Sequence, residues 1–289
     1  MPELPEVETI RRGLAGELTG SIFSGVEIIN ESSMPESSSL GTELLLDQEI
    51  VGLRRRGKVL IIDVGKNYSL LIHLKMTGQL ILERPDGGRE GGGHPTKAMV
   101  SALPDKSTRV VFDFSDGKRL FFNDQRKFGW IKLKDRGEVE QDSLLMRMGE
   151  EPLEAGFIEE VLRKKLRGRK APIKALLLDQ TTVAGLGNIY VDESLHLAKI
   201  HPETKAIDLN DEQIAKLHSS IVDIIRTAVR LEGTTLRNYL NHRGEKGGYF
   251  EHARVFDRTG LPCPECGEEI EKIRVAGRGT HICVNCQRK

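Results

Sequence analysis

The four cysteines of the chain form two C-x2-C pairs within its last 27 residues. The pairs, Cys263 with Cys266 and Cys283 with Cys286, are separated by sixteen residues. Each pair can present two thiolates from one tight turn, a pattern typical of a tetrahedral structural zinc site. Disulfides are the alternative, but they are rare in the cytosol, and four clustered cysteines are too many for a redox pair. Since four protein ligands leave no open position on the metal, the sequence predicts one structural Zn²⁺ without a catalytic role.

Size and composition indicate a two-domain cytoplasmic protein. At 289 residues the chain is long enough to bury two cores. No apolar run approaches the length of a membrane span. The acidic N-terminus also lacks the basic and apolar regions of a signal peptide. We therefore expect a cytoplasmic location and no membrane partner.

Charge is balanced overall, with 43 Lys and Arg against 43 Asp and Glu, so net charge does not indicate a polyanionic partner. The distribution of charge is more informative. One basic cluster spans residues 54–58 and a second spans residues 163–170. Either cluster could be an ordinary solvated face. Two of them, beside features suited to phosphate binding, favour a nucleic-acid partner.

The first six residues, Met-Pro-Glu-Leu-Pro-Glu, suggest a reactive N-terminus. Removal of Met1 would leave Pro2 as a terminal secondary amine, next to the carboxylate of Glu3. A terminal amine has a reference pKa of about 7.7–8.0 against about 10.4 for lysine, so its free-base fraction at neutral pH is about a few hundred times larger. Such an amine can attack a sugar carbon and form an iminium ion, while Glu3 moves the proton. The alternative is that Pro2 and Pro5 only mark the start of a helix.

Hydrophobic periodicity predicts a mostly β first half that begins with a helix over residues 6–18. Residues 31–43 are Ser-rich and residues 85–94 contain five glycines, so we expect loops there, the second extending over 85–97. Two pairs of apolar strands flank turn residues and predict hairpins: 59–64 with 69–74, and 108–114 with 118–122. The expected fold of this half is a β-sandwich preceded by a helix.

The second half is predicted to be helical. Residues 173–178 and 189–198 read as two helices around a glycine-rich turn. Asn210 and Gln213 resemble a capping pair that opens a long amphipathic helix ending near Gly233. The cysteine module is expected to fold as a hairpin of strands 270–275 and 280–284, with Arg278 in its tip. The expected domains are 1–136 (β-sandwich), 137–156 (linker), 157–251 (helical) and 252–289 (zinc finger).

Six sequence motifs are spread over the whole chain. They are PELPEV at 2–7, GK at 57–58, HLKMTG at 73–78, RKFG at 126–129, GLGNIY at 185–190 and the four-cysteine finger. Together they resemble the formamidopyrimidine-DNA glycosylase family of bacterial base-excision enzymes. The resemblance runs from end to end and implies a two-domain α+β fold with a helix–two-turn–helix DNA-binding region. Endonuclease VIII proteins, which are related, usually begin with Pro-Glu-Gly-Pro-Glu and lack the Met and Arg-x-Phe set.

The resemblance implies catalytic roles at both ends of the chain. Pro2 would attack the deoxyribose C1′ of a damaged nucleotide and form an imine, with Glu3 as general acid and base. Lys58 and Arg278 would contact phosphates and donate protons during β- and δ-elimination. Glu6 would hold the helix N-terminus and the amine. On position alone, Lys58 could instead be an ordinary exposed lysine, and Glu6 a favourable carboxylate in a first helical turn.

The resemblance also implies DNA contacts. Met76, Arg126 and Phe128 match residues that fill the gap left by an extruded base, with Arg126 facing the orphaned cytosine. On sequence alone, Met76 and Phe128 could be core residues, but both positions read as loop tips. Asn188 lies where a glycine-rich turn meets a helix, a place suited to phosphate, although it could be a simple cap.

Lys170 and His73 are implied as further contacts to the DNA backbone. Residues 237–250 read as a mobile polar loop and resemble the segment that closes over the flipped base. The implied partner is damaged double-stranded DNA, bound by a monomer in the bacterial cytosol, at the nucleoid.

Three functions remain open at this point. The leading hypothesis is a bifunctional DNA glycosylase and apurinic/apyrimidinic (AP) lyase that removes 8-oxoguanine and formamidopyrimidines. A non-catalytic DNA-binding protein would use the glycine-rich turn and the finger only, and would bind in a salt-dependent way without cutting the strand. A lyase that prefers pyrimidine lesions, like endonuclease VIII, is the third.

Overall fold

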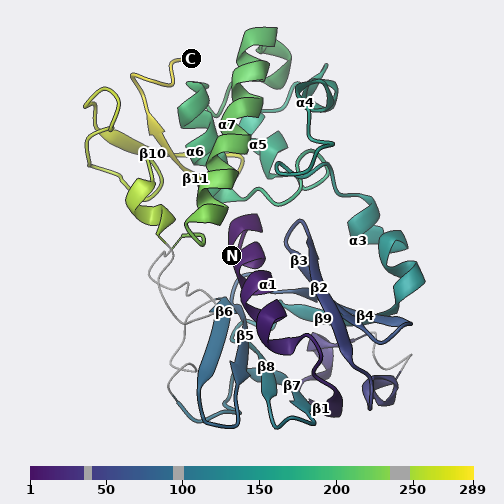
Figure 1. Ribbon diagram of the computed structural model, residues 1–289. Coiled ribbons are helices and arrows are strands. Elements are labelled where there is room, and N and C mark those ends of the chain that lie inside the picture. The colour runs from purple at the N-terminus through teal and green to yellow at the C-terminus, as the bar shows by residue number, and fades with distance from the viewer. Residues whose placement is uncertain (36–40, 94–100, 235–247) are drawn as a thin grey trace. The chain divides into compact units, whose positions relative to one another are not determined.

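The computed structural model describes residues 1–35, 41–93, 101–234 and 248–289 (Figure 1). The chain forms two compact units. Unit 1 comprises Met1–Met146 and Leu231–Gly248, and unit 2 comprises Arg147–Arg230 and Tyr249–Lys289. The chain therefore passes between units within the segment 137–156 and again around residues 231 and 248. None of the helices in the described part of the chain is both long and apolar enough to cross a membrane.

Unit 1 consists of helix α1 (Leu4–Leu18) and two antiparallel sheets. The five-stranded sheet has the order β1-β7-β8-β5-β6, and the four-stranded sheet has the order β2-β3-β4-β9. The four-residue helix α3 (Ser143–Met146) and three short 3₁₀ helices, η1 (Glu31–Ser33), η2 (Thr42–Leu45) and η4 (Arg136–Gln141), complete this unit among the described residues. The strands are β1 (Phe23–Ile28), β2 (Ile50–Arg56), β3 (Val59–Val64), β4 (Tyr68–His73), β5 (Gly78–Glu83), β6 (Arg89–Gly93), β7 (Thr108–Phe114), β8 (Arg119–Asp124) and β9 (Trp130–Asp135).

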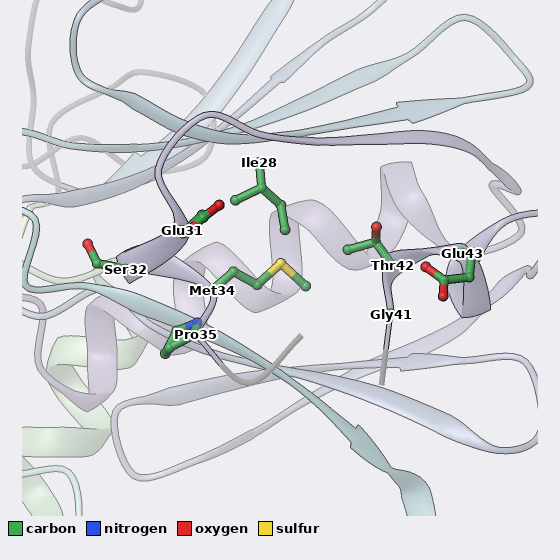
Figure 2. A pocket seen from close by; sticks show the side chains of 8 residues that line it. All are labelled: Ile28, Glu31, Ser32, Met34, Pro35, Gly41, Thr42 and Glu43. Atoms are coloured by element: carbon green, nitrogen blue, oxygen red, sulfur yellow. The ribbon is translucent and has the colours of Figure 1, made fainter. Parts of the chain in front are cut away.

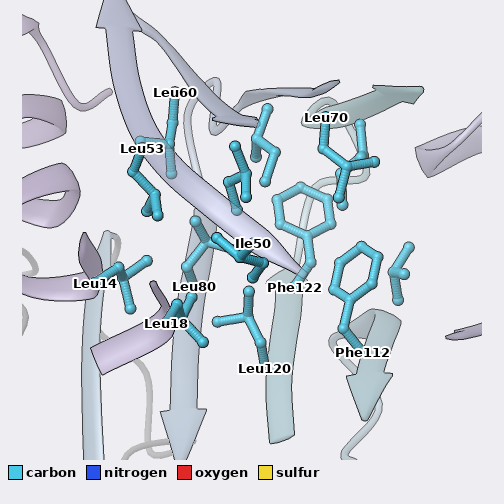
Figure 3. Packing of buried hydrophobic residues seen from close by; sticks show 14 of the residues in the cluster. Leu14, Leu18, Ile50, Leu53, Leu60, Leu70, Leu80, Phe112, Leu120 and Phe122 are labelled. Carbon is cyan, nitrogen blue, oxygen red and sulfur yellow. The ribbon is translucent and has the colours of Figure 1, made fainter. Parts of the chain in front are cut away.

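The core of unit 1 lies between the two sheets, because alternate residues of each strand point to one face. Leu80 and Phe122 from the five-stranded sheet meet Leu60 and Leu70 from the other sheet in one buried cluster (Figure 3). Their strand neighbours Ile81, Val111 and Phe121 face the opposite way and form a separate, smaller cluster. The two predicted hairpins are confirmed as β3–β4 and β7–β8.

Helix α1 packs against β2 and β3 of one sheet and β6 of the other. Leu14 and Leu18 point from this helix into the central cluster (Figure 3). A Cβ on Gly92 of β6 would lie 2.2 Å from Ile10 Cγ1, so the close approach of helix and strand requires glycine there. The prediction of a loop over 85–94 is therefore wrong for residues 89–93, which pair with β5. Residues 94–97 of the predicted 85–97 loop lie outside the described residues.

Unit 2 packs helices against the cysteine hairpin. Its long helix α7 is capped as predicted: the Asn210 N–H donates to Gln213 Oε1 (3.0 Å), and the Gln213 N–H donates to Asn210 Oδ1 (2.8 Å). Helix α6 packs against α5, α7 and β11. The elements are α4 (Glu159–Leu166), α5 (Ile173–Leu178), α6 (Asn188–Ala198), η5 (Ala206–Asp208), α7 (Asp211–Arg230), η6 (Tyr249–His252), β10 (Ile270–Val275) and β11 (Arg278–Cys283).

Candidate nucleic-acid interface and metal centre

Pro2 and Glu3 lie at the buried start of α1, with Glu3 at its N-cap position. The Glu3 N–H donates to Glu6 Oε2 at 2.8 Å, so a carboxylate one turn along the helix fixes the backbone next to Pro2. The other oxygen, Glu6 Oε1, accepts the N–H (2.9 Å) and the hydroxyl (3.1 Å) of Thr234. Glu6 is 2% exposed and receives three hydrogen bonds, and it therefore does more than favour a first helical turn.

The Gly233–Thr234 turn depends on this carboxylate as well. Gly233 has a φ of +82°, and a Cβ on it would lie 2.7 Å from Glu6 Oε1, so glycine is required on both counts. Glu6 thus connects the start of the chain to Thr234, 228 positions away in the sequence. Most of the predicted 237–250 loop follows directly, and its residues 237–247 lie outside the described residues.

Lys58 lies in the turn between β2 and β3 and is only 4% exposed, so the interpretation as an ordinary exposed lysine is wrong. Its chain neighbour Val59 pairs with His73 across the β3–β4 ladder. Burial first, and then the positive charges of Lys75 and Lys58, lower the pKa of His73 to about 3. His73 Nδ1 accepts the Lys75 N–H at 2.9 Å, so the neutral ring carries its proton on Nε2, where it can donate.

The first basic cluster is largely neutralised within unit 1. Arg54 pairs with Asp63 (3.0 Å) and Glu140 (2.8 Å). Arg55 is 7% exposed at its side chain and pairs with Glu8 (3.2 Å). The expectation that this cluster presents a basic surface to nucleic acid is therefore wrong for these two arginines, because Arg55 pairs with an acid of α1 and Arg54 pairs with acids of β3 and η4.

Three exposed side chains gather on two loops of unit 1. Met76 is 42% exposed and Phe128 is 53% exposed, which confirms that both lie at loop tips and excludes the core interpretation. Arg126 lies with both, because its Nη1 is 3.2 Å from Met76 Sδ and its guanidinium lies 4.8 Å from the Phe128 ring centroid. We call Met76, Arg126 and Phe128 the exposed triad.

Asp124, at the end of β8, builds the loop that carries the triad. Its Oδ1 accepts the Thr77 hydroxyl and the Arg126 N–H (3.1 Å), while its Oδ2 accepts the Gly129 N–H (2.6 Å). Asp124 is 0% exposed. The Gly129 N–H and the Thr77 hydroxyl donate to this buried carboxylate, while the Arg126 N–H is shared between Asp124 and Thr77 Oγ1 (3.0 Å). The role of Asp124 was not predicted from the sequence, although a charged side chain at the end of an apolar strand, just before the RKFG motif, indicates a residue that needs polar partners.

Unit 2 places Asn188 and Arg278 next to each other. Asn188 is the first residue of α6, after the N-cap Gly187, so it is not the simple cap that was considered. Its Nδ2 donates to the carbonyl of Gly279 at 3.0 Å, next to Arg278 in the chain. Arg278 is exposed and begins β11 opposite Val275, so it is the first residue of the strand and not, as predicted, part of the hairpin tip. Lys170 is exposed between α4 and α5.

The four cysteines form a site that fits a tetrahedral metal ion. Their sulfur atoms all lie within 4.8 Å of one another, and all four cysteines are free of disulfides. Cys263 Sγ lies 3.9 Å from Cys286 Sγ, and Cys266 Sγ lies 3.4 Å from Cys283 Sγ. A zinc ion bound at about 2.3 Å by four thiolates would separate them by about 3.8 Å. This agreement excludes the disulfide alternative and supports the predicted metal centre.

A surface pocket of about 700 Å³ lies elsewhere on unit 1, lined by Met34, Thr42 and neighbouring residues (Figure 2). It borders residues 36–40, which lie outside the described part of the chain. None of the predicted site residues lines it. Unit 1 carries the candidate residues around Pro2, Lys58 and the exposed triad, and unit 2 carries those around Asn188.

The comparisons with known proteins cover the whole chain. The formamidopyrimidine-DNA glycosylase N-terminal domain matches residues 1–131, the formamidopyrimidine-DNA glycosylase H2TH domain matches 148–239, and the zinc finger found in FPG and IleRS matches 260–288. The chain is 42% identical to the formamidopyrimidine-DNA glycosylase of Desulforamulus reducens over 295 residues, covering 100% of this chain and 99% of the relative.

Solved structures agree with the sequence comparisons. A Lactococcus lactis Fpg variant bound to Fapy-dG containing DNA is 38% identical and superimposes with a TM-score of 0.89, covering 100% of both chains. The wild-type Lactococcus lactis protein, solved with an oxidised pyrimidine containing DNA, is 38% identical with a TM-score of 0.88, again covering 100% of both chains.

Proposed function

The chain belongs to the formamidopyrimidine-DNA glycosylase family and is a base-excision repair DNA glycosylase, and we propose that it removes oxidised purines and then cleaves the strand as an AP lyase. The substrates would be 8-oxoguanine and formamidopyrimidines in duplex DNA, bound by a monomer in the cytoplasm. The observation that carries this proposal is the exposed triad. Its two apolar side chains are held in solvent around an arginine and do not contribute to a core, so they are available to contact DNA.

The triad suits an enzyme that extracts a nucleotide from the helix. Extraction leaves a gap in the base stack, and an apolar wedge can occupy it at a cost of a few kcal/mol of unstacking. Met76 and Phe128 would fill this gap, while Arg126, which lies between them, would hydrogen-bond the orphaned cytosine. A non-catalytic binder that uses only the glycine-rich turn and the finger needs none of these three.

The chemistry would begin at Pro2 after removal of Met1. The Pro2 nitrogen forms a bond to C1′ as the glycosidic bond breaks, and the base departs with the bonding electrons. The Pro2 nitrogen then loses its proton, and the departing base takes one up. Glu3 gives a proton to O4′ as the sugar ring opens, leaving an iminium ion that acidifies the C2′–H bond. Loss of that proton expels the 3′ phosphate, a second elimination expels the 5′ phosphate, and water releases Pro2.

The remaining residues would hold the DNA. Lys58, His73, Lys170, Asn188 and Arg278 would contact phosphates, with Lys58 and Arg278 also donating protons to the two eliminations. Glu6 would keep Pro2 in place through the backbone of Glu3. One Zn²⁺ held by the four cysteines would fold the finger and supply no step of the reaction.

Borohydride trapping on a duplex with 8-oxoguanine opposite cytosine tests the proposal, using protein shown by mass spectrometry to begin at Pro2. We expect a covalent adduct that maps to Pro2, no adduct on undamaged duplex, and none from protein that retains Met1. Pro2→Gly should keep some activity, because a primary terminal amine remains. Glu3→Gln should bind the duplex but excise the lesion poorly. Glu31→Gln makes the same chemical change at an exposed carboxylate and should excise the lesion as well as wild type does.

Absence of an adduct from protein that begins at Pro2 and binds the duplex would contradict the imine mechanism and favour a non-catalytic binder. Oxidised pyrimidines are a second candidate substrate class, because the Lactococcus lactis relative was solved with such a lesion. Including a duplex with an oxidised pyrimidine in the same assay separates the two preferences.

A further inference from the structure

A buried histidine lies against one of the four cysteines. His196 belongs to α6 and is 0% exposed, and its Nε2 lies 3.4 Å from Cys263 Sγ. A cysteine that binds a metal is a thiolate, which offers lone pairs and no hydrogen. The ring nitrogen that faces the sulfur must therefore carry the hydrogen and donate it.

The position of the ring relative to the sulfur is fixed by neighbouring residues of the same helix. Asp192 Oδ2 accepts the N–H of His281 in β11 at 2.9 Å. Glu193 Oε1 accepts the N–H groups of Val255 (2.9 Å) and Phe256 (2.8 Å), in the segment that leads into the finger. Asp192 and Glu193 thus attach α6 to the cysteine module at two places, and His196, one turn further along, faces the first cysteine.

We propose that His196 is an outer-shell residue of the metal centre, whose Nε2–H donates to the Cys263 thiolate and slows the loss of zinc. Four thiolates around Zn²⁺ leave a net charge of about −2, and a buried thiolate such as that of Cys263 is stabilised by an N–H donor. Outer-shell donors to metal ligands typically change metal affinity about 10–100-fold. The inference rests on the zinc site proposed above.

Release of zinc from the full-length protein to an excess of a chromogenic chelator tests the inference. Phe at position 196 keeps a ring without the donor. Gln can place an amide N–H near the site of Nε2, while Asn is too short to reach it. We expect His196→Phe and His196→Asn to release zinc about 10-fold faster than wild type, and His196→Gln to stay within about two-fold.

Glu271→Gln is the matched control. Glu271 is an exposed residue of β10 in the same hairpin, and no contact of its side chain with a cysteine or with His196 is found among the described residues. Its release rate should match that of wild type. Cobalt-substituted protein gives a second readout, because the sulfur-to-cobalt charge-transfer bands should shift in the Phe and Asn variants and not in the Gln variant.

Each outcome decides the inference. Wild-type release rates and unshifted cobalt bands in His196→Phe would overturn it. It would also be overturned if His196→Gln released zinc as fast as His196→Phe, because the effect would then come from packing of the ring and not from its N–H. If His196→Phe fails to fold by circular dichroism, the comparison of Gln with Asn decides. Wild-type protein that holds no zinc by elemental analysis would refute the metal centre itself, and the role of His196 with it.

Discussion

Asp124→Asn is the sharpest test of how the exposed triad is built. The carboxylate of Asp124 receives three donors: the Thr77 hydroxyl, the Arg126 N–H and the Gly129 N–H. Asparagine keeps one oxygen and places an amide N–H where the other oxygen was. If the amide replaces Oδ2, the Gly129 N–H loses its acceptor; if it replaces Oδ1, the Arg126 N–H keeps only Thr77 Oγ1 (3.0 Å). In both cases a backbone donor faces another donor in a site that is 0% exposed in the wild type.

The expected loss of stability follows from these contacts. A hydrogen bond to a charged group contributes about 1.5–3 kcal/mol, and a buried donor left without a partner costs about 1–3 kcal/mol. Because the loop can relax in part, we expect unfolding to become easier by about 2–4 kcal/mol. For a unit of this size, about 2–4 °C of Tm corresponds to each kcal/mol, so Tm should fall by about 5–15 °C.

Thermal unfolding and binding to a lesion-containing duplex together check this prediction. Arg126 and Phe128 should lose their fixed positions in the loop, so part of the binding free energy is spent on ordering them. A loss of about 1.4 kcal/mol of binding free energy corresponds to a 10-fold fall in affinity for the duplex, which is the size of effect we expect. Asp135→Asn makes the same chemical change at an exposed position of unit 1 and should leave both quantities unchanged. An Asp124→Asn protein with wild-type Tm and affinity would refute the view that this carboxylate builds the loop.

Three further predictions concern the N-terminus, pH and the metal. Glu6→Gln replaces one of the two oxygens that accept the Glu3 and Thr234 N–H groups. It should therefore slow imine trapping and lower the free energy of unfolding by about 1.5–3 kcal/mol, and an unchanged rate of trapping would contradict this. Because the pKa of His73 is lowered from 6.5 to about 3, unfolding takes up a proton between these values, so stability should fall as the pH falls from 6.5 towards 3. His73 should contribute about 1.4 kcal/mol per pH unit to this slope, and denaturant titrations should show that contribution removed in His73→Gln. Chelation of the metal should abolish ordered structure in residues 260–288 by hydrogen exchange and weaken DNA binding, while the β-sheets of unit 1 stay protected.

Local chemistry explains which parts of the fold could be predicted from the sequence. The capping pair Asn210–Gln213 and the two hairpins are set by residues within a few positions of one another, and the structure confirms them. Strand β6 was missed because its glycines read as a loop. Its strand state comes from pairing with β5 and from the close approach of Ile10, which lies about 80 positions away and gives no local signal.

The candidate site was predictable where a motif fixes both residue type and place, as for the cysteines and the exposed triad. The pairing of Arg54 and Arg55 was not predictable, because Glu140 and Glu8, which lie far from them in the sequence, decide it. Burial of Lys58 was not predictable either, since it depends on the tertiary packing around the turn between β2 and β3. Asp192 and Glu193 were missed for the same reason. Acids are almost never fully buried without partners, and these two accept backbone N–H groups of the cysteine module.

Asp192 also forms an ion pair with Lys174 in the interior of unit 2, and the contacts of this pair with β11 explain why it is kept. Lys174 and Asp192 are 0% exposed and 2.5 Å apart, and Lys174 Nζ also donates to the Thr280 hydroxyl at 2.8 Å. A buried ion pair adds little net stability, since desolvation offsets the attraction, and apolar residues of equal volume can replace one without loss. The pair instead fixes β11 against α6, so the backbone beside Arg278 has one position relative to Asn188. Two proposed phosphate contacts on separate elements require this fixed geometry, and an apolar replacement would leave them free to shift.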